Sequence, residues 1–200
     1  MMDKIAKLGL LTAAAIFCLV PAPGAQADVN TVMASCGGCH GKDGASTDPT
    51  VPIIGGLSAT YFADTMTAYK TKERPCPATD PKAVAMCAVA GGTGDADIKQ
   101  VADYLSKQKF VRASQTVDSA LAEKGKQIHQ QNCEKCHSSN GSAAADDAGI
   151  LAGQWMPYLK AQLAEFKSGA RKVDPKMKAV VDRLDAAGID ALVNYYASVK

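Results

Sequence analysis

The chain has 200 residues, enough for one or two domains. Hydrophobic residues make up 47% of it and charged residues 21%, a composition typical of a globular protein rather than of a membrane-embedded or disordered one. The formal net charge of +2 provides no basic field suited to nucleic acid, so we expect no nucleic-acid partner.

The N-terminal segment 1–27 has the pattern of a secretory signal peptide. Two lysines precede a 13-residue apolar run at 8–20, and Ala-Gln-Ala follows at 25–27 as a small-x-small cleavage site. The alternative is an uncleaved anchor, but the run is too short to cross about 30 Å of hydrocarbon, so we expect no membrane span. We therefore expect a mature chain that begins at Asp28 and is exported to a bacterial periplasm.

The pentapeptide Cys-x-x-Cys-His occurs twice, at 36–40 and at 133–137. This is the attachment signature of c-type haem, in which two thiols add to the vinyl groups and the adjacent histidine becomes an axial iron ligand. A zinc site is the alternative for paired cysteines. The immediate histidine, a paired downstream methionine and the export signal all favour haem. The sequence thus predicts two covalently bound haem c groups, with the following attachment cysteines and axial histidines: Cys36, Cys39, Cys133, Cys136, His40 and His137.

The surroundings of the two motifs also repeat. At an offset of 97 residues, Gly56 aligns with Gly153 and Tyr61 with Tyr158. Farther along, the offset falls to 91, and further pairs align: Ile98 with Ile189, Tyr104 with Tyr195, and Met86 with Met177. A repeat of this length predicts two domains of like fold, at 28–113 and 118–200, joined by a linker at 114–117.

Helical patterns account for the rest of the mature chain. We expect Ser58 to cap a helix that runs to about residue 72, and Asp95 to cap one that runs to about residue 107. In the second half we expect helices from Asp118 to Cys133, over 154–167, from Asp174-Pro175 onward and over 186–199. No segment alternates with period two between hairpin turns, so the predicted class is all-α. Each half is small enough that its own core is marginal, and haem would supply the apolar centre.

The sixth iron ligand decides between electron transfer and ligand chemistry, and a methionine thioether favours electron transfer. Met86 and Met177 are the mature-chain methionines that align with each other, each at the same spacing before the shared isoleucine of the last helix. Met33 is too close to its cysteines, Met66 aligns with a leucine and marks a core position, and Met156 has no methionine counterpart. We therefore expect His40 with Met86, and His137 with Met177, as axial pairs.

The first half also contains Cys76 and Cys87, which have no counterpart in the second half. A disulfide is the default in an oxidising compartment. Two alternatives stay open, both requiring a free thiolate: Cys87 could ligate iron, or the pair could bind copper. We interpret His129 as a solvated polar residue and Trp155 as a packing residue near a haem or the domain interface.

The whole mature chain resembles the dihaem class I cytochromes c, whose halves pack about a pseudo-twofold axis. Within them, the segment 150–159, Ile-Leu-Ala-Gly-Gln-Trp-Met-Pro-Tyr-Leu, is similar to cytochrome c4. The segments 118–122 and 133–137, the run at 152–159 and the closing Tyr-Ala-Ser at 196–198 are more similar to the dihaem subunit of flavocytochrome c sulfide dehydrogenase. This resemblance implies two tandem class I cytochrome c domains, each built around one covalent haem.

The resemblance also implies partners. A flavocytochrome subunit would form a heterodimer with a flavoprotein that oxidises sulfide and holds FAD, and would pass single electrons to a soluble acceptor. A free cytochrome c4-like shuttle to a terminal oxidase is the alternative, and a haem enzyme with an open coordination site is a weaker one. The chain shows no catalytic triad, phosphate loop or flavin fingerprint, so we identify no catalytic residue. The first half departs from cytochrome c4 at 55–58, and we read its cysteine loop as replacing Arg171 and Lys172.

Overall fold

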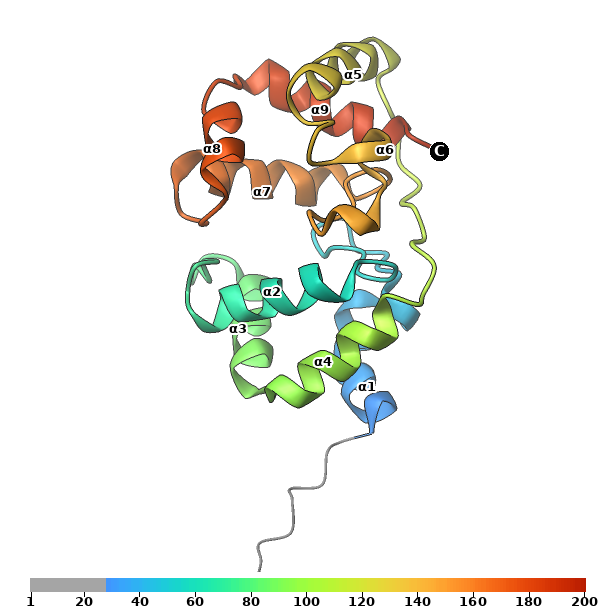
Figure 1. Cartoon of the computed structure of the whole chain (residues 1–200), viewed down its shortest axis with the longest axis vertical. Helices are drawn as coiled ribbons and strands as arrows, with labels where there is room; N and C mark the ends of the chain where they lie inside the picture. The colour runs from blue at the N-terminus through green and yellow to red at the C-terminus, as the bar shows by residue number, and fades with distance from the viewer. Residues whose placement is uncertain (1–27) are drawn as a thin grey trace, which may run out of the picture.

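The computed structural model describes residues 28–200, and within this range the regular structure is entirely helical, as predicted. The predicted signal peptide lies outside the described residues. Figure 1 shows two helical halves stacked along the long axis and joined by an extended segment on one side. No helix among residues 28–200 combines the length and the apolar character needed to cross a membrane.

The two halves have a similar order of elements. The first contains α1 (Val29–His40), η1 (Lys42–Gly44), α2 (Ala59–Lys70), α3 (Pro81–Gly92) and α4 (Asp95–Leu105). The second contains α5 (Ser119–Asn132), α6 (Ser138–Gly141), η2 (Ala144–Asp146), α7 (Met156–Ser168), α8 (Pro175–Val181) and α9 (Ala186–Ser198).

Side-chain caps begin several of these helices where the sequence predicted them. Ser58 accepts a hydrogen bond from the backbone of Tyr61 at the start of α2, and Asp118 caps α5 in the same manner. The prediction for α4 was wrong by one residue: Gly94 is the N-cap, and Asp95 is the first helical residue, where its charge favours the helix dipole. Helix α3, which we did not predict, begins after a capping Asp80.

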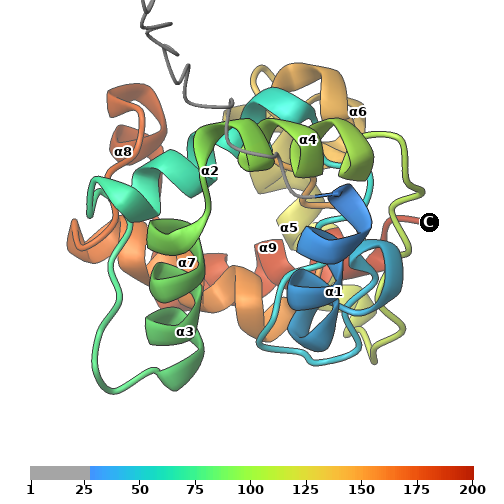
Figure 2. The same ribbon diagram turned by 90° about the horizontal axis from the view of Figure 1, so that it is seen from below.

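The buried side chains form two hydrophobic clusters, one mainly in each half, and the first also includes Ile150 of the second half. In the first, helices α4 and α2 contribute the buried side chains Ile98, Val101, Ala102, Leu105, Phe62, Met66 and Tyr69. In the second, α9 packs across α5 and α7, and its buried residues include Leu192, Val193, Tyr195 and Tyr196. Figure 2 shows α3 on the left and α1 on the right of the first half, with α2 and α4 along its upper side.

Hydrogen bonds reproduce the internal repeat. The backbone N–H of Gly56 donates to Leu105, and the N–H of Gly153 donates to Tyr196, both at 2.8 Å. These pairs are related by the same two offsets that were found in the sequence. A second pair follows the same rule, since Tyr104 donates to Asp43 at 2.5 Å and Tyr195 donates to Asn140 at 2.8 Å. The two halves therefore share one backbone plan.

Hydrogen bonds join the two halves across their interface. The buried amide of Gln154 donates from Nε2 to the carbonyl of Ile53 and accepts at Oε1 from its N–H, both at 2.9 Å. Trp155 donates from Nε1 to the carbonyl of Ser46 at 3.1 Å, which places it at the interface, one of the two locations expected for it. Since these bonds satisfy backbone groups that the interface buries, they fix one relative placement of the halves.

The contact between α5 and α9 is close enough to require glycine. A Cβ built on Gly125 would collide with the carbonyl of Ala191 and with the Cβ of Tyr195. We predict that Gly125→Ala lowers the free energy of unfolding of the haem-loaded protein by about 1–3 kcal/mol. Urea unfolding followed by far-UV circular dichroism measures this loss. Gly91→Ala is the matched control, because a Cβ on this helical glycine meets nothing within 4 Å; equal losses in both variants would contradict the close crossing.

Candidate haem-binding sites

The first Cys-x-x-Cys-His motif forms the last turn of α1. Its two cysteines lie three residues apart, which places them on one face of the helix. Cys36 is half-buried against the first hydrophobic cluster, whereas Cys39 is exposed, and both are free thiols. Burial raises the pKa of Cys36, so this free thiol is protonated at neutral pH.

His40 ends α1 with its ring oriented by a backbone carbonyl. Its Nδ1 lies 2.8 Å from the carbonyl oxygen of Pro52. A carbonyl can only accept, so Nδ1 carries the proton and Nε2 is left with a lone pair. Burial lowers the pKa of His40, which keeps the imidazole neutral at neutral pH. A neutral ring with a free Nε2 is the form that binds a metal.

The second motif follows the end of α5. Its cysteines and histidine are buried much as in the first motif, but the histidine ring is held differently. Cys133 is half-buried, Cys136 is exposed, and both are free thiols. Burial lowers the pKa of His137, and the carbonyl of Gly149, the equivalent of Pro52, opposes the shift. Nδ1 of His137 is nevertheless buried without a well-formed hydrogen bond. This ring is therefore less firmly oriented than that of His40.

The two aligned methionines lie on equivalent helices. Met86 is on α3 and packs, half-buried, against the same hydrophobic cluster as Cys36. Met177 is on α8 and is also half-buried. Met66 is buried in the first core, as predicted for a core position. In the first half, α1 ends with His40 and α3 carries Met86, so the two candidate ligands come from helices on opposite sides (Figure 2).

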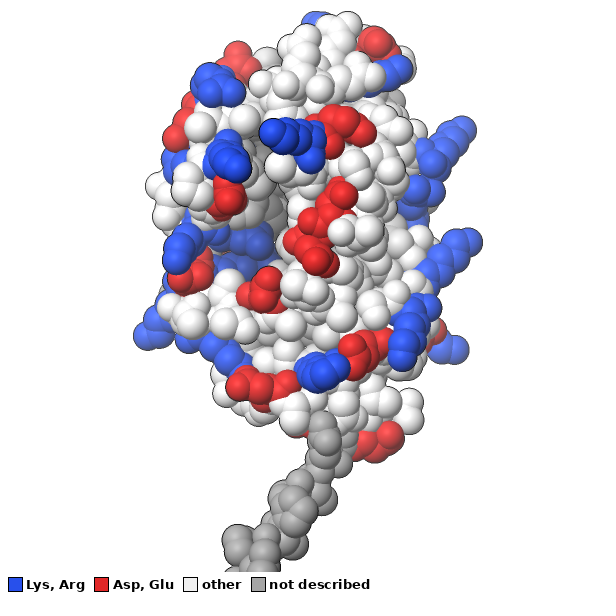
Figure 3. All heavy atoms as spheres, viewed as in Figure 1, with Lys and Arg blue, Asp and Glu red and all other residues white. Residues whose placement is uncertain are grey.

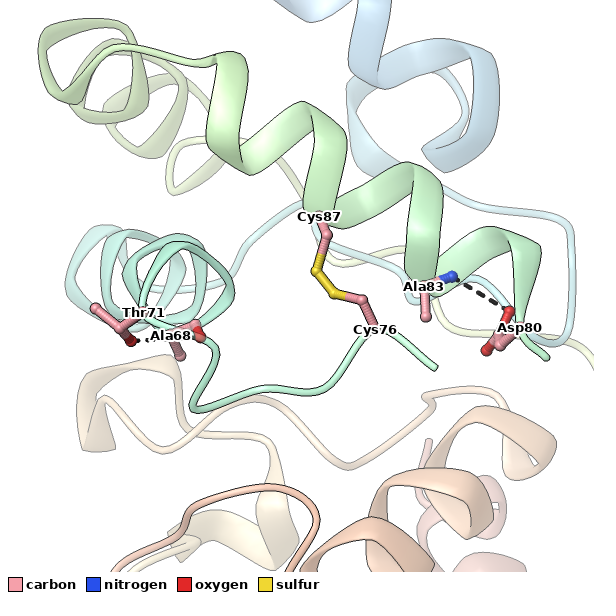
Figure 4. Close-up of a disulfide and its surroundings, with 6 residues drawn as sticks. All are labelled: Ala68, Thr71, Cys76, Asp80, Ala83 and Cys87. Carbon is pink, nitrogen blue, oxygen red and sulfur yellow. Dashed lines mark hydrogen bonds between the residues drawn. A yellow bond between two sulfur atoms is a disulfide. The ribbon is translucent and has the colours of Figure 1, made fainter. Parts of the chain in front are cut away.

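The structure joins Cys76 and Cys87 in a disulfide with Cα atoms 6.3 Å apart. Figure 4 shows that it ties the loop after α2 to α3, beside the turn that Asp80 caps. A disulfide has no free thiolate, so neither cysteine is available to ligate iron or copper in this state. Cys87 directly follows Met86, and the crosslink therefore restrains the helix that presents this methionine.

The prediction for His129 was wrong. The side chain is fully buried, with Nδ1 3.1 Å from the hydroxyl of Tyr196 and Nε2 hydrogen-bonded to the carboxylate of Glu134. The helix α9 covers this face of α5, and the rings of Tyr195 and Tyr196 have their centroids 5.2 and 5.5 Å from the imidazole. Glu134 belongs to the second haem motif, so the pattern of α5 alone gave no indication of this contact.

The prediction for the cysteine loop was also wrong, because Arg171 has a counterpart in the first half. We expected the cysteine loop to replace Arg171 and Lys172, but Arg74 is the equivalent of Arg171 at the same offset of 97 residues. The backbone N–H of Arg74 donates to Ala68 at 2.9 Å, and that of Arg171 donates to Glu165 at 3.1 Å. The loop begins after Arg74. Extending the repeat four residues past Lys70 would have found this pair.

These residues fit two c-type haems. Each half offers a pair of free thiols next to a neutral imidazole, and a half-buried thioether on a separate helix. Residues 28–200 contain no cluster of three or more histidine, cysteine, aspartate or glutamate side chains that could hold a metal ion. The donor set therefore suits covalent haem and does not suit a structural zinc site.

Comparisons with known proteins agree with this geometry. A family described as "Cytochrome c" matches residues 26–109, and one described as "Cytochrome C oxidase, cbb3-type, subunit III" matches residues 120–195. Cytochrome c4 of Azotobacter vinelandii is 30% identical over 93% of this chain and 94% of its own. A thiosulfate dehydrogenase electron acceptor of Thiomonas intermedia (strain K12) is 26% identical over 96% of this chain and 89% of its own.

A solved structure shows the same tandem arrangement. The crystal structure of reduced recombinant cytochrome c4 from Pseudomonas stutzeri superposes with a TM-score of 0.72 at 27% identity, covering 88% of this chain and all of the other. This likeness extends over both halves, as do the duplicated haem motifs and the all-helical repeat. The chain belongs to the cytochrome c4 family of dihaem class I cytochromes c and carries two covalently bound haem c groups.

Proposed function

We propose that this dihaem electron-transfer protein holds its irons with His40 and Met86 in the first half, and with His137 and Met177 in the second. The haems would be attached at Cys36 and Cys39, and at Cys133 and Cys136. The observation that carries the assignment is the placement of the aligned methionines on equivalent helices, with α3 opposite α1. The two halves would be the units 28–113 and 118–200, and the segment 1–27 would direct export to the periplasm.

The chain's own residues would set the properties of each site. Bound haem supplies a one-electron couple, and a thioether ligand raises its potential and leaves no open coordination position. The carbonyl of Pro52 holds the ring of His40 in one orientation, which limits structural change when the charge of the iron changes. The disulfide restrains α3 and keeps Met86 in place. These features favour electron transfer over ligand binding.

The donor would be a sulfur-compound dehydrogenase that binds this cytochrome as a subunit. A flavoprotein that oxidises sulfide is the specific candidate, on the resemblance at 118–122 and 152–159. The Thiomonas relative is named for accepting electrons from thiosulfate dehydrogenase, which supports the broader class. Helix α3 exposes Val84 (44%) and Val89 (38%), and residues 83–94 carry no charge. An uncharged, apolar face suits a lasting interface.

The second half presents a different face at the equivalent place. Three lysines, Lys172, Lys176 and Lys178, lie on or just before α8. Positive charge accelerates encounter with an acidic partner without requiring a lasting complex. This half would therefore deliver electrons to a soluble acceptor. A free shuttle to a terminal oxidase is the alternative, favoured by the match of residues 120–195 to the cbb3-type oxidase subunit III family.

Replacing the proposed second-half thioether tests the ligand assignment. We predict that Met177→Ala removes about half of the methionine–iron charge-transfer absorption, makes the second haem reactive toward added ligands and lowers its potential. Visible spectroscopy and redox titration measure these changes. Met156→Ala is the control, because this residue packs against the second hydrophobic cluster at the start of α7. A fully low-spin Met177→Ala spectrum would remove Met177 from the ligand set.

The disulfide gives a second prediction. Replacing Cys76 and Cys87 together by serine removes a crosslink across 11 residues. We expect the free energy of unfolding to fall by about 2–3 kcal/mol, and the first haem, but not the second, to become easier to saturate with added imidazole. Mass spectrometry that finds two free thiols in the native protein would contradict the crosslink itself.

The partner proposal is tested by native purification. We expect a flavoprotein to co-purify, and sulfide to reduce the haems of the complex. Val84→Asp should weaken the complex roughly tenfold or more, since it places a charge in an apolar interface. Lys176→Gln, which changes the charge on α8 by the same one unit, should instead slow reoxidation by an acceptor. A complex that is reduced by thiosulfate and lacks flavin would replace the sulfide proposal, and isolation of a lone cytochrome would favour the shuttle.

A further inference from the structure

The second haem motif, unlike the first, lies outside a helix. Helix α1 includes the whole of the first motif and ends at His40, whereas α5 ends at Asn132, one residue before Cys133. The ring of His40 is also held by a backbone carbonyl, but Nδ1 of His137 has no well-formed hydrogen bond. The second motif therefore lacks both of the supports that hold the first.

His129 holds the start of the second motif with its main chain and its side chain. Its carbonyl oxygen accepts from the N–H of Cys133 at 2.7 Å and from the N–H of Glu134 at 3.0 Å. Its Nε2 is hydrogen-bonded to the carboxylate of Glu134, and a carboxylate accepts, so Nε2 carries the proton. Its Nδ1 lies 3.1 Å from the hydroxyl of Tyr196, which can donate to it.

Burial gives this network one preferred geometry. Charged side chains of both signs are spread over the surface of the molecule, as Figure 3 shows for one face. His129 is instead fully buried, and Tyr196 is 4% exposed. A buried polar group that loses its partner destabilises the fold, so the imidazole is confined to the position that satisfies both of its nitrogens. Since Tyr196 belongs to α9, the network ties the motif to the last helix of the chain.

The first half has no equivalent network. At the offsets of 97 and 91 residues, the corresponding positions are apolar or glycine: Val32 for His129, Gly37 for Glu134 and Leu105 for Tyr196. Val32 and Leu105 belong to the first hydrophobic cluster. The polar network thus occurs only in the half whose helix stops before the motif, which indicates that it compensates for the missing helical turn.

Cys133 connects the network to the proposed haem site. It packs against the second hydrophobic cluster, which includes Tyr196. Burial raises the pKa of Cys133, and a hydrogen bond from Tyr196 opposes that shift. Glu134 lies between the two cysteines of the motif, and His137 ends it. A displacement of Glu134 would therefore move the same short backbone segment that carries the attachment thiols and the imidazole.

We infer that Tyr196, His129 and Glu134 position the second haem motif and thereby orient the ring of His137. They act through the backbone of the motif, in the way that outer hydrogen-bond partners orient a metal-binding histidine. The inference rests on the proposed function, in which Cys133 and Cys136 attach the second haem and His137 binds its iron. It does not depend on the electron donor.

Truncating Glu134 in the haem-loaded protein tests the network. The haem-methyl signals in the NMR spectrum of the oxidised protein follow the orientation of the axial ligands. In Glu134→Ala we expect the signals of the second haem to change position, and those of the first to stay. Imidazole should half-saturate the second haem at about fivefold lower concentration, the equivalent of one hydrogen bond. The side chain of Glu134 is 39% exposed, so its loss is compatible with folding.

Lys135→Ala is the matched control. It truncates the neighbouring charged side chain of the same motif, which is exposed and takes part in no ion pair among residues 28–200. We expect both the NMR signals and the imidazole concentration to match those of the wild type. A change as large as that in Glu134→Ala would overturn the inference.

Two further variants separate positioning from charge and from packing. Glu134→Gln removes the charge but keeps an oxygen that accepts from His129, so it should retain the wild-type signals. Tyr196→Phe keeps the ring and changes no charge, but removes the hydroxyl, so it should move the signals of the second haem. Unchanged signals in Tyr196→Phe, or equal changes in Glu134→Gln and Glu134→Ala, would overturn the inference.

Mass spectrometry of haem-bearing peptides from the wild-type protein tests the premise separately. We expect the second haem on the peptide that contains Cys133 and Cys136. A second haem attached elsewhere would contradict the proposed function, and the inference with it. Haem on this peptide, together with wild-type signals in both Glu134→Ala and Tyr196→Phe, would contradict the inference alone.

Discussion

The amide of Gln154 makes the contact on which the arrangement of the two halves depends. It satisfies both backbone polar groups of Ile53 across a buried interface. Ile53 directly follows Pro52, whose carbonyl orients the ring of His40. One side chain of the second half therefore helps to fix the loop that holds the proposed axial ligand of the first. The contact made by Gln154 therefore restrains both this loop and the relative placement of the two halves.

The two halves share a backbone plan but differ in how they hold and present their proposed methionine ligands. In the first half, a disulfide restrains α3, and this helix exposes the apolar side chains of Val84 and Val89. In the second, α8 is shorter, carries lysines and has no crosslink. His40 has a carbonyl partner, whereas Nδ1 of His137 lacks a well-formed one. Such differences give the two haems different surroundings, which a directional path from donor to acceptor requires.

Local sequence patterns predicted the parts of the fold that depend on covalent or short-range effects. The haem motifs, the cap at Ser58 and the start of α5 at Asp118 depend on spacing within a few residues. His129 was misjudged because its burial comes from α9, which is separated from α5 in the chain by α6, η2, α7 and α8. Helix α3 was missed because its apolar, glycine-containing sequence has no polar face to reveal a helical period.

The arginine pair could not be interpreted from either half alone. From the sequence alone, an arginine at position 74 would be interpreted as an exposed cation. Its burial follows from the second half, where Tyr158 and Gln162 accept its hydrogen bonds. Duplication of one cytochrome unit placed two equivalent cations at the pseudo-twofold interface, where like charges repel. Gln162 accepts from both guanidinium groups, so one side chain of the second half holds an arginine from each half at this interface.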